Sequence, residues 1–150
     1  GLDFGAKHES SKKEQLSVFE AVCEACSGGG KTLSLHSVRS AGTVLDVLEK
    51  TGTIDNCRCV FHWFSGTSKE LVRAKEAGCW FSVGERMLGT RRGREYARQI
   101  PRSRLLLETD LPEARKDGTA ATDIAKSLTR AVEILASIKE GWEPSQARLF

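Results

Sequence analysis

The chain has 150 residues, of which 39% are apolar and 29% charged. This length and composition suit one globular domain and exclude a disordered chain. The net charge of +3 is too small to indicate a nucleic-acid or membrane partner by itself. No apolar run is long enough to cross a bilayer, which excludes a transmembrane protein.

Apolar periodicity and capping signals predict helices and strands in alternation. Ser11 and Glu14 have the spacing of a capping box, and Thr67 and Glu70 repeat it. The helix after Ser11 should bury Leu16, Phe19, Val22 or Cys23, and Cys26. Four short apolar runs predict strands, over residues 32–36, 59–62, 80–83 and 105–109. Helices are expected after Ser11, near 44–48, after Thr67, over 90–99 and over 124–138.

Strands that alternate with helices over short connections are typical of a parallel sheet with right-handed crossovers. Two α/β architectures fit this order: an open doubly wound sheet, or part of a (β/α)₈ barrel.

The five cysteines could suggest a metal site or a disulfide framework. Their odd number argues against paired disulfides of the secreted type. Cys23-x-x-Cys26 and Cys57-x-Cys59 have a zinc-like spacing, but both pairs fall in apolar patterns. We therefore predict free thiols that pack as small apolar residues, as suits a reducing cytoplasm.

Polar side chains follow the ends of the predicted strands. His36 ends the first strand, His62 the second, and Glu108 and Asp110 the fourth. Asp3 ends what looks like the tail of an earlier strand. A barrel places its active site at the carboxyl ends of its strands, and two imidazoles with a carboxylate suit a divalent metal ion. A structural role for a single histidine is the alternative for each position.

Several cationic and aromatic side chains lie near the same strand ends. Arg86 follows the third strand and is a candidate contact for a phosphate. Trp63 follows His62 and could stack on a base. Arg94 and Arg98 are expected on a solvated helix face, and Trp80 and Trp142 in packing roles.

A series of short motifs is spread along the whole chain: Gly1-Leu2-Asp3-Phe4, Leu35-His36, Phe61-His62-Trp63-Phe64-Ser65-Gly66, Ile100-Pro101, Leu105-Leu106-Leu107-Glu108-Thr109-Asp110-Leu111-Pro112 and Arg148-Leu149-Phe150. In these motifs and their order the chain resembles the TatD-type metal-dependent hydrolases. Residues 83–88, Val-Gly-Glu-Arg-Met-Leu, resemble more narrowly the TatD-like component of bacterial anti-phage Qat cassettes.

The resemblance implies a (β/α)₈ barrel of the amidohydrolase type that trims DNA from single-stranded or 3′ ends. It implies His36, His62 and Asp110 as ligands of one or two divalent ions (Mg, Mn or Zn), with Asp110 also acting in catalysis. Glu108 and Asp3 are then expected to support the ligands or to contact substrate. Gln15 and Phe19 match a helix pattern of the family that we interpret as packing.

Two departures from the family pattern matter. The His-x-His motif of the first strand and the metal-bridging glutamate are not in this chain. The family arginine two residues after the metal-binding histidine is Val38 here, and Arg39 follows it. Arg39 is therefore a candidate substrate contact in a shifted position.

A complete barrel needs about 250 residues and eight strands, so residues 1–150 are expected to form one partial barrel that lacks the N-terminal strands. Either an N-terminal segment or a partner protein completes the barrel, or the chain is a natural truncation. The enzyme hypothesis is metal-dependent hydrolysis of DNA phosphodiester bonds. One rival is an inactive subunit that binds proteins, as in a defence complex, and another is a hydrolase of small amides or phosphoesters.

Overall fold

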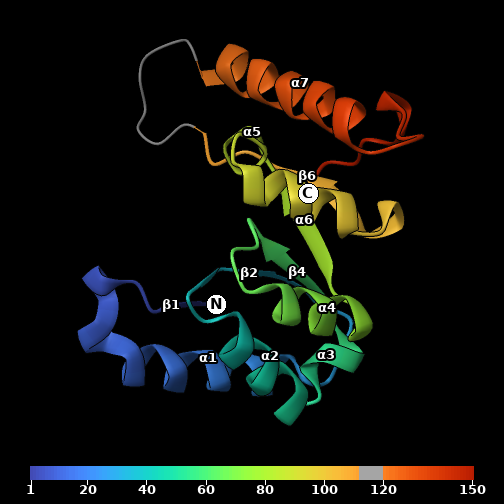
Figure 1. Ribbon diagram of the computed structural model, residues 1–150. Helices are drawn as coiled ribbons and strands as arrows, with labels where there is room; N and C mark the ends of the chain where they lie inside the picture. Colours follow the sequence, from blue (N-terminus) through green and yellow to red (C-terminus); the bar gives the residue numbers. More distant parts are fainter. Residues whose placement is uncertain (112–119) are drawn as a thin grey trace. The chain divides into compact units, whose positions relative to one another are not determined.

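The computed structural model describes residues 1–111 and 120–150 (Figure 1). Its elements, in chain order, are β1 (Leu2–Asp3), the 3₁₀ helix η1 (Ala6–Ser11), α1 (Lys12–Cys26), β2 (Thr32–Leu35), β3 (Ser37–Val38), α2 (Ala41–Lys50), α3 (Thr53–Asn56), β4 (Arg58–His62), α4 (Ser68–Glu76), β5 (Trp80–Val83), α5 (Glu85–Leu88), α6 (Arg91–Gln99), η2 (Arg102–Arg104), β6 (Leu105–Leu107), α7 (Ala120–Ile138) and η3 (Pro144–Gln146). The paired strands run parallel, which confirms the predicted α/β class. None of the described helices has the length and apolar character needed to cross a membrane.

The chain forms two compact units, residues 1–80 and 81–150. In the first unit β2 pairs with β4, with Leu35 opposite Phe61, and β1 pairs with β3, with Leu2 opposite Ser37. Helices α1 to α4 gather on one side of β2 and β4 (Figure 1). The core of this unit consists of side chains that are at most a few per cent exposed, among them Leu35, Val44, Leu45, Leu48, Phe61, Phe64 and Leu71.

One of the two predicted capping boxes forms. The Thr67 hydroxyl accepts from the Glu70 amide at 3.2 Å, and Glu70 Oε2 accepts from the Thr67 amide at 2.6 Å. The box predicted at Ser11 is wrong, although α1 does begin at the next residue. The Ser11 hydroxyl instead donates to the carbonyl of His8, because η1 precedes α1 and occupies the place of an ordinary N-cap turn.

The buried stripe of α1 consists of Phe19 and Cys23, and Val22 is 48% exposed. Of the two alternatives in the sequence, Cys23 is therefore the buried one. The helix ends at Cys26 because Gly29 and Gly30 take positive φ angles of 88° and 72°, which only glycine adopts without strain.

In the second unit β5 pairs with β6, with Phe81 opposite Leu105, and the C-terminal segment forms a parallel bridge to β6 at Leu149. Helix α7 packs against β6, α5 and α6. Ala131 and Leu135 are fully buried in its predicted stripe. Trp142 is buried too, as its expected packing role requires.

Two predicted strands are shorter than expected. The run 32–36 ends as a strand at Leu35, because the chain then leaves β4 and pairs with β1 through Ser37 and Val38. The run 105–109 ends at Leu107. His36, Glu108 and Asp110 therefore lie just beyond strand ends, whereas His62 is the last residue of β4.

All five cysteines are free thiols, as predicted. Burial raises the pKa of Cys23 to about 11 and that of Cys59 to about 12. Both thiols therefore stay protonated at neutral pH in the absence of a metal ion. Cys57 donates its thiol to the Cys26 carbonyl at 3.2 Å. The burial of Cys23, Cys59 and Cys79 agrees with the packing interpretation.

Candidate metal centre

His36 lies beside Asp3, which is 33 residues away in the sequence. The two meet because β1 runs alongside the segment after β2, where the Leu2 amide donates to the His36 carbonyl at 2.8 Å. His36 Nε2 and Asp3 Oδ2 are 3.3 Å apart. The Gly5 amide donates to Asp3 Oδ1 at 2.8 Å and, with the contact to His36, holds the pKa of Asp3 below its usual range. Asp3 is therefore a carboxylate at neutral pH and an acceptor for the imidazole.

His62 occupies the equivalent position on the neighbouring strand. Leu35 of β2 is opposite Phe61 of β4, so His36 and His62 each follow one member of this pair. Successive side chains of a strand point to opposite faces, and Leu35 and Phe61 are buried. His36 and His62 therefore lie at the same end of the β2–β4 pair.

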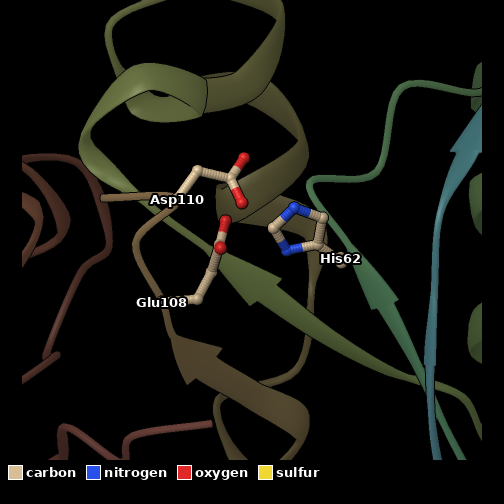
Figure 2. Close-up of side chains that lie close together, drawn as sticks. All are labelled: His62, Glu108 and Asp110. Carbon is tan, nitrogen blue, oxygen red and sulfur yellow. The ribbon is translucent and has the colours of Figure 1, made fainter. Parts of the chain in front are cut away.

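Glu108 and Asp110 follow β6 and form a carboxylate pair. The Glu108 amide donates to the Val83 carbonyl at 3.1 Å, which extends the pairing of β5 and β6 by one residue. Residues two apart in an extended segment point the same way, and carboxylate oxygens of the two lie within 4.8 Å of each other (Figure 2). Gly84 passes close to this pair, because a Cβ there would lie 2.8 Å from the Glu108 carbonyl oxygen.

The donor types fit a divalent cation. Ions such as Mg²⁺ hold oxygen ligands at about 2.1 Å, so ligands of one ion lie roughly 3–4 Å apart, a separation that Glu108 and Asp110 can reach. A histidine that binds metal through one ring nitrogen usually donates the other to a carboxylate, which fixes its tautomer. Asp3 stands in that relation to His36.

Two further candidates have a strained backbone. Arg39 and Trp63 have φ angles of 52° and 43°, and they are the non-glycine residues with positive φ in the described part of the chain. Each follows a candidate histidine, by three residues and by one residue. Such conformations cost about 1–3 kcal/mol each and tend to occur at functional sites.

The three arginines near the third predicted strand, Arg86, Arg94 and Arg98, differ in exposure and in the groups that surround them. Arg86 is exposed on α5, where the preceding Glu85 pairs with Arg130 of α7 at 2.8 Å. Arg98 is exposed and pairs with Glu95 at 3.3 Å, as expected for a solvated helix face. The same expectation is wrong for Arg94, which is half-buried and donates to the Leu88 carbonyl at 3.0 Å. Its guanidinium binds one of the carbonyls that the end of α5 leaves without a helical partner.

The prediction that Gln15 is a packing residue is also incomplete. Its side-chain amide makes hydrogen bonds to the backbone amide and the backbone carbonyl of Asp3. A glutamine within an otherwise apolar helix stripe was the available signal in the sequence. Nothing in the sequence indicated its partner. Phe19, the other residue of that pattern, is buried as expected.

Parallel strands that carry imidazoles and carboxylates at their carboxyl ends are typical of part of a (β/α)₈ barrel enzyme, whose active site lies at that end of the barrel. Comparison with known proteins identifies the family. The family model of TatD-related DNases matches residues 1–146, and the chain belongs to this family. The solved structure of a TatD family hydrolase from Entamoeba histolytica matches 97% of the chain with a TM-score of 0.72 at 18% identity, which shows the shared fold.

Two curated relatives have more similar sequences. The chain is 31% identical over 112 residues to "Deoxyribonuclease Tat-D" of Schizosaccharomyces pombe, covering 75% of this chain and 36% of that protein. It is 34% identical over 115 residues to "3'-5' ssDNA/RNA exonuclease TatD" of Edwardsiella piscicida, covering 75% of this chain and 44% of that protein. The chain thus matches less than half of the length of these relatives.

Proposed function

We propose that this chain is the metal-binding portion of a nuclease that hydrolyses DNA phosphodiester bonds. The observation that carries the proposal is the Asp3–His36 pair, with Nε2 and Oδ2 3.3 Å apart, since it orients an imidazole at a strand end as metal sites require. The names of the two curated relatives support DNA as substrate and single-stranded 3′ ends as the point of attack.

We assign His36, His62 and Asp110 as ligands of one or two divalent ions (Mg, Mn or Zn). The strands of a (β/α)₈ barrel present their carboxyl ends at one rim, and the three proposed ligands lie at or just after the carboxyl ends of β2, β4 and β6. When bound, the ion polarises the phosphate and lowers the pKa of a bound water.

The remaining roles fall to side chains of this chain. Asp110 accepts the proton of the attacking water, and Glu108 holds Asp110 in place from two residues away. Asp3 fixes the tautomer of His36. Arg86 or Arg39 neutralises phosphate charge through a bidentate guanidinium contact. Trp63, which follows His62, stacks on a base.

A direct test compares cleavage of end-labelled single-stranded DNA with Mg²⁺, Mn²⁺ or Zn²⁺ and with EDTA. Asp110→Asn should lower the rate by about 100-fold or more, because the amide cannot accept the proton and binds metal poorly. Asp123→Asn is a matched control on the exposed face of α7 and should cleave as the wild type does. Full metal-dependent activity in Asp110→Asn would rule the assignment out.

The second candidate is an inactive component that binds other proteins. Metal analysis separates the two candidates, since an inactive subunit has no need for a bound ion. Substoichiometric metal together with intact DNA would favour the protein-binding role, and cleavage of small esters but not DNA would favour a small-molecule hydrolase.

For the biological role of this nuclease we propose anti-phage defence in the cytoplasm. The resemblance of residues 83–88 to the Qat component suggests this role. Plaque counts on cells that carry the intact operon, or the same operon with Asp110→Asn, test it. Equal plaque counts for the intact operon and for cells without the operon would contradict it.

A further inference from the structure

Strand β1 has one edge without a strand partner among the described residues, and the backbone of Asp3 faces it. The amides of Leu2 and Phe4 donate to the carbonyls of His36 and Val38, each at 2.8 Å. Backbone groups of successive strand residues point to opposite edges. The N–H and C=O of Asp3 therefore point away from β3.

The side-chain amide of Gln15 meets both of these groups. The Asp3 amide donates to Gln15 Oε1 at 2.7 Å, and Gln15 Nε2 donates to the Asp3 carbonyl at 2.9 Å. Gln15 Nε2 also reaches the Ser11 hydroxyl at 3.0 Å and the His8 carbonyl at 3.3 Å. One half-buried amide thus takes the place of a neighbouring strand at this edge.

We propose that Gln15 is a positioning residue, which fixes the backbone of Asp3 and, through the Asp3 carboxylate, the ring of His36. The contacts form one continuous path. Gln15 holds both backbone groups of Asp3, the Gly5 amide holds Oδ1, and Oδ2 meets His36 Nε2 at 3.3 Å. The role rests on the proposed function, in which His36 holds the ion.

The chemistry of the contact explains why this position carries glutamine. A primary amide offers a donor and an acceptor in one plane, as a backbone peptide does. A carboxylate of the same size can accept from the Asp3 amide but, when ionised, cannot donate to the Asp3 carbonyl. Leucine fills a similar volume and makes neither contact.

The test uses two substitutions and a matched control. In Gln15→Leu the Asp3 amide should exchange with solvent at least about tenfold faster, and ¹³C relaxation of the His36 ring should report greater mobility. In Gln15→Glu the Asp3 amide should keep its acceptor and exchange as slowly as in the wild type at pH 7.5, whereas loss of the donor to the Asp3 carbonyl should still raise the mobility of the His36 ring. Gln99→Leu makes the same chemical change on the exposed face of α6 and should alter neither measurement.

A third measurement links this role to metal binding. Mn²⁺ affinity should fall about threefold to tenfold in Gln15→Leu, since groups that orient metal ligands typically contribute 10–100-fold and Gln15 acts one contact further away. An unchanged Asp3 amide or an unchanged His36 ring in Gln15→Leu would overturn the positioning role. Failure of the wild-type protein to bind Mn²⁺ would overturn the proposed function instead, and the exchange and relaxation data would still decide the contact itself.

Discussion

Arg39 carries strain in its backbone while its side chain is exposed. Its φ of 52° lies in the left-handed region, where a side chain crowds the following carbonyl, and no burial of the side chain offsets this cost. The shifted arginine position noted in the sequence thus coincides with a strained residue. This combination is expected where side-chain direction matters more than stability.

Arg39→Gly should separate stability from activity. Glycine adopts the left-handed conformation freely, so we expect the free energy of unfolding to rise by about 0.5–1 kcal/mol after its own entropy cost. Loss of the guanidinium should lower DNA cleavage by about tenfold or more. Urea unfolding followed by circular dichroism, together with the cleavage assay, measures both effects.

Lys31→Gly is the control for Arg39→Gly. Lys31 is exposed and has an ordinary φ, so its replacement removes a positive charge without relieving strain and should destabilise slightly. Equal loss of stability in the two variants would show that the conformation of Arg39 stores no strain.

At the scale of elements, single polar side chains join helices that are distant in sequence. Glu70 accepts from the Thr67 amide at the start of α4 and from the Gly42 amide in the first turn of α2, at 2.6 Å and 2.8 Å. One carboxylate thus satisfies two helix N-termini, whose partial positive charge favours it. In the second unit the Lys139 ammonium donates to carbonyls at the C-terminus of α6, where the partial charge of a helix is negative.

Lys139→Met should destabilise the packing of α7 on α6. Lys139 is 8% exposed, and its ammonium donates to the carbonyls of Ala97, Arg98 and Ile100 at 2.9, 3.0 and 2.6 Å. Methionine has a similar shape but leaves these carbonyls at the end of α6 without their donor. We expect a loss of about 2–3 kcal/mol in urea unfolding.

Lys126→Met on the exposed face of α7 is the matched control and should stay within about 0.5 kcal/mol of the wild type. If Lys139→Met had an equally small effect, the three hydrogen bonds would contribute little beyond what water provides to the same carbonyls.

At the scale of the whole molecule, the proposed ligands come from both compact units. His36 and His62 belong to residues 1–80, and Glu108 and Asp110 to residues 81–150. An ion held by the proposed ligands should stabilise the folded protein, because a ligand that binds only the folded state shifts the unfolding equilibrium.

We therefore expect Mn²⁺ to raise the melting temperature and EDTA to reverse the rise. At a concentration of 100 times Kd the gain is about 2.7 kcal/mol, or roughly 5–10 °C for a chain of this length. His62→Ala and Asp110→Asn should each abolish the shift in differential scanning fluorimetry. His8→Ala, which removes an exposed imidazole, should retain it.

A shift that survives one of the two substitutions would contradict the assignment of that residue as a ligand, while DNA cleavage could still be assayed independently.

The sequence by itself determined most of the elements and predicted the candidate ligands. The four main strands, the helices after Thr67 and Thr90, and the glycine stops follow from periodicity and capping, which act over a few neighbouring residues. The candidate ligands could be named for the same reason, since each lies at or within a few residues of the end of its own strand. The family motifs added the barrel and the metal.

Only the tertiary structure decided which groups meet. Asp3 reaches His36 across 33 residues, and Lys139 reaches Ala97 across 42. Gln15 looked like a packing residue because its partners belong to the backbone of another element, which no side-chain pattern records. The ends of β2 and β6 also differ from the predicted ones, because a strand ends where its pairing with the neighbouring strand ends and not where its apolar run stops. Hydrogen bonds between distant segments depend on the whole fold, and local periodicity carries no information about them.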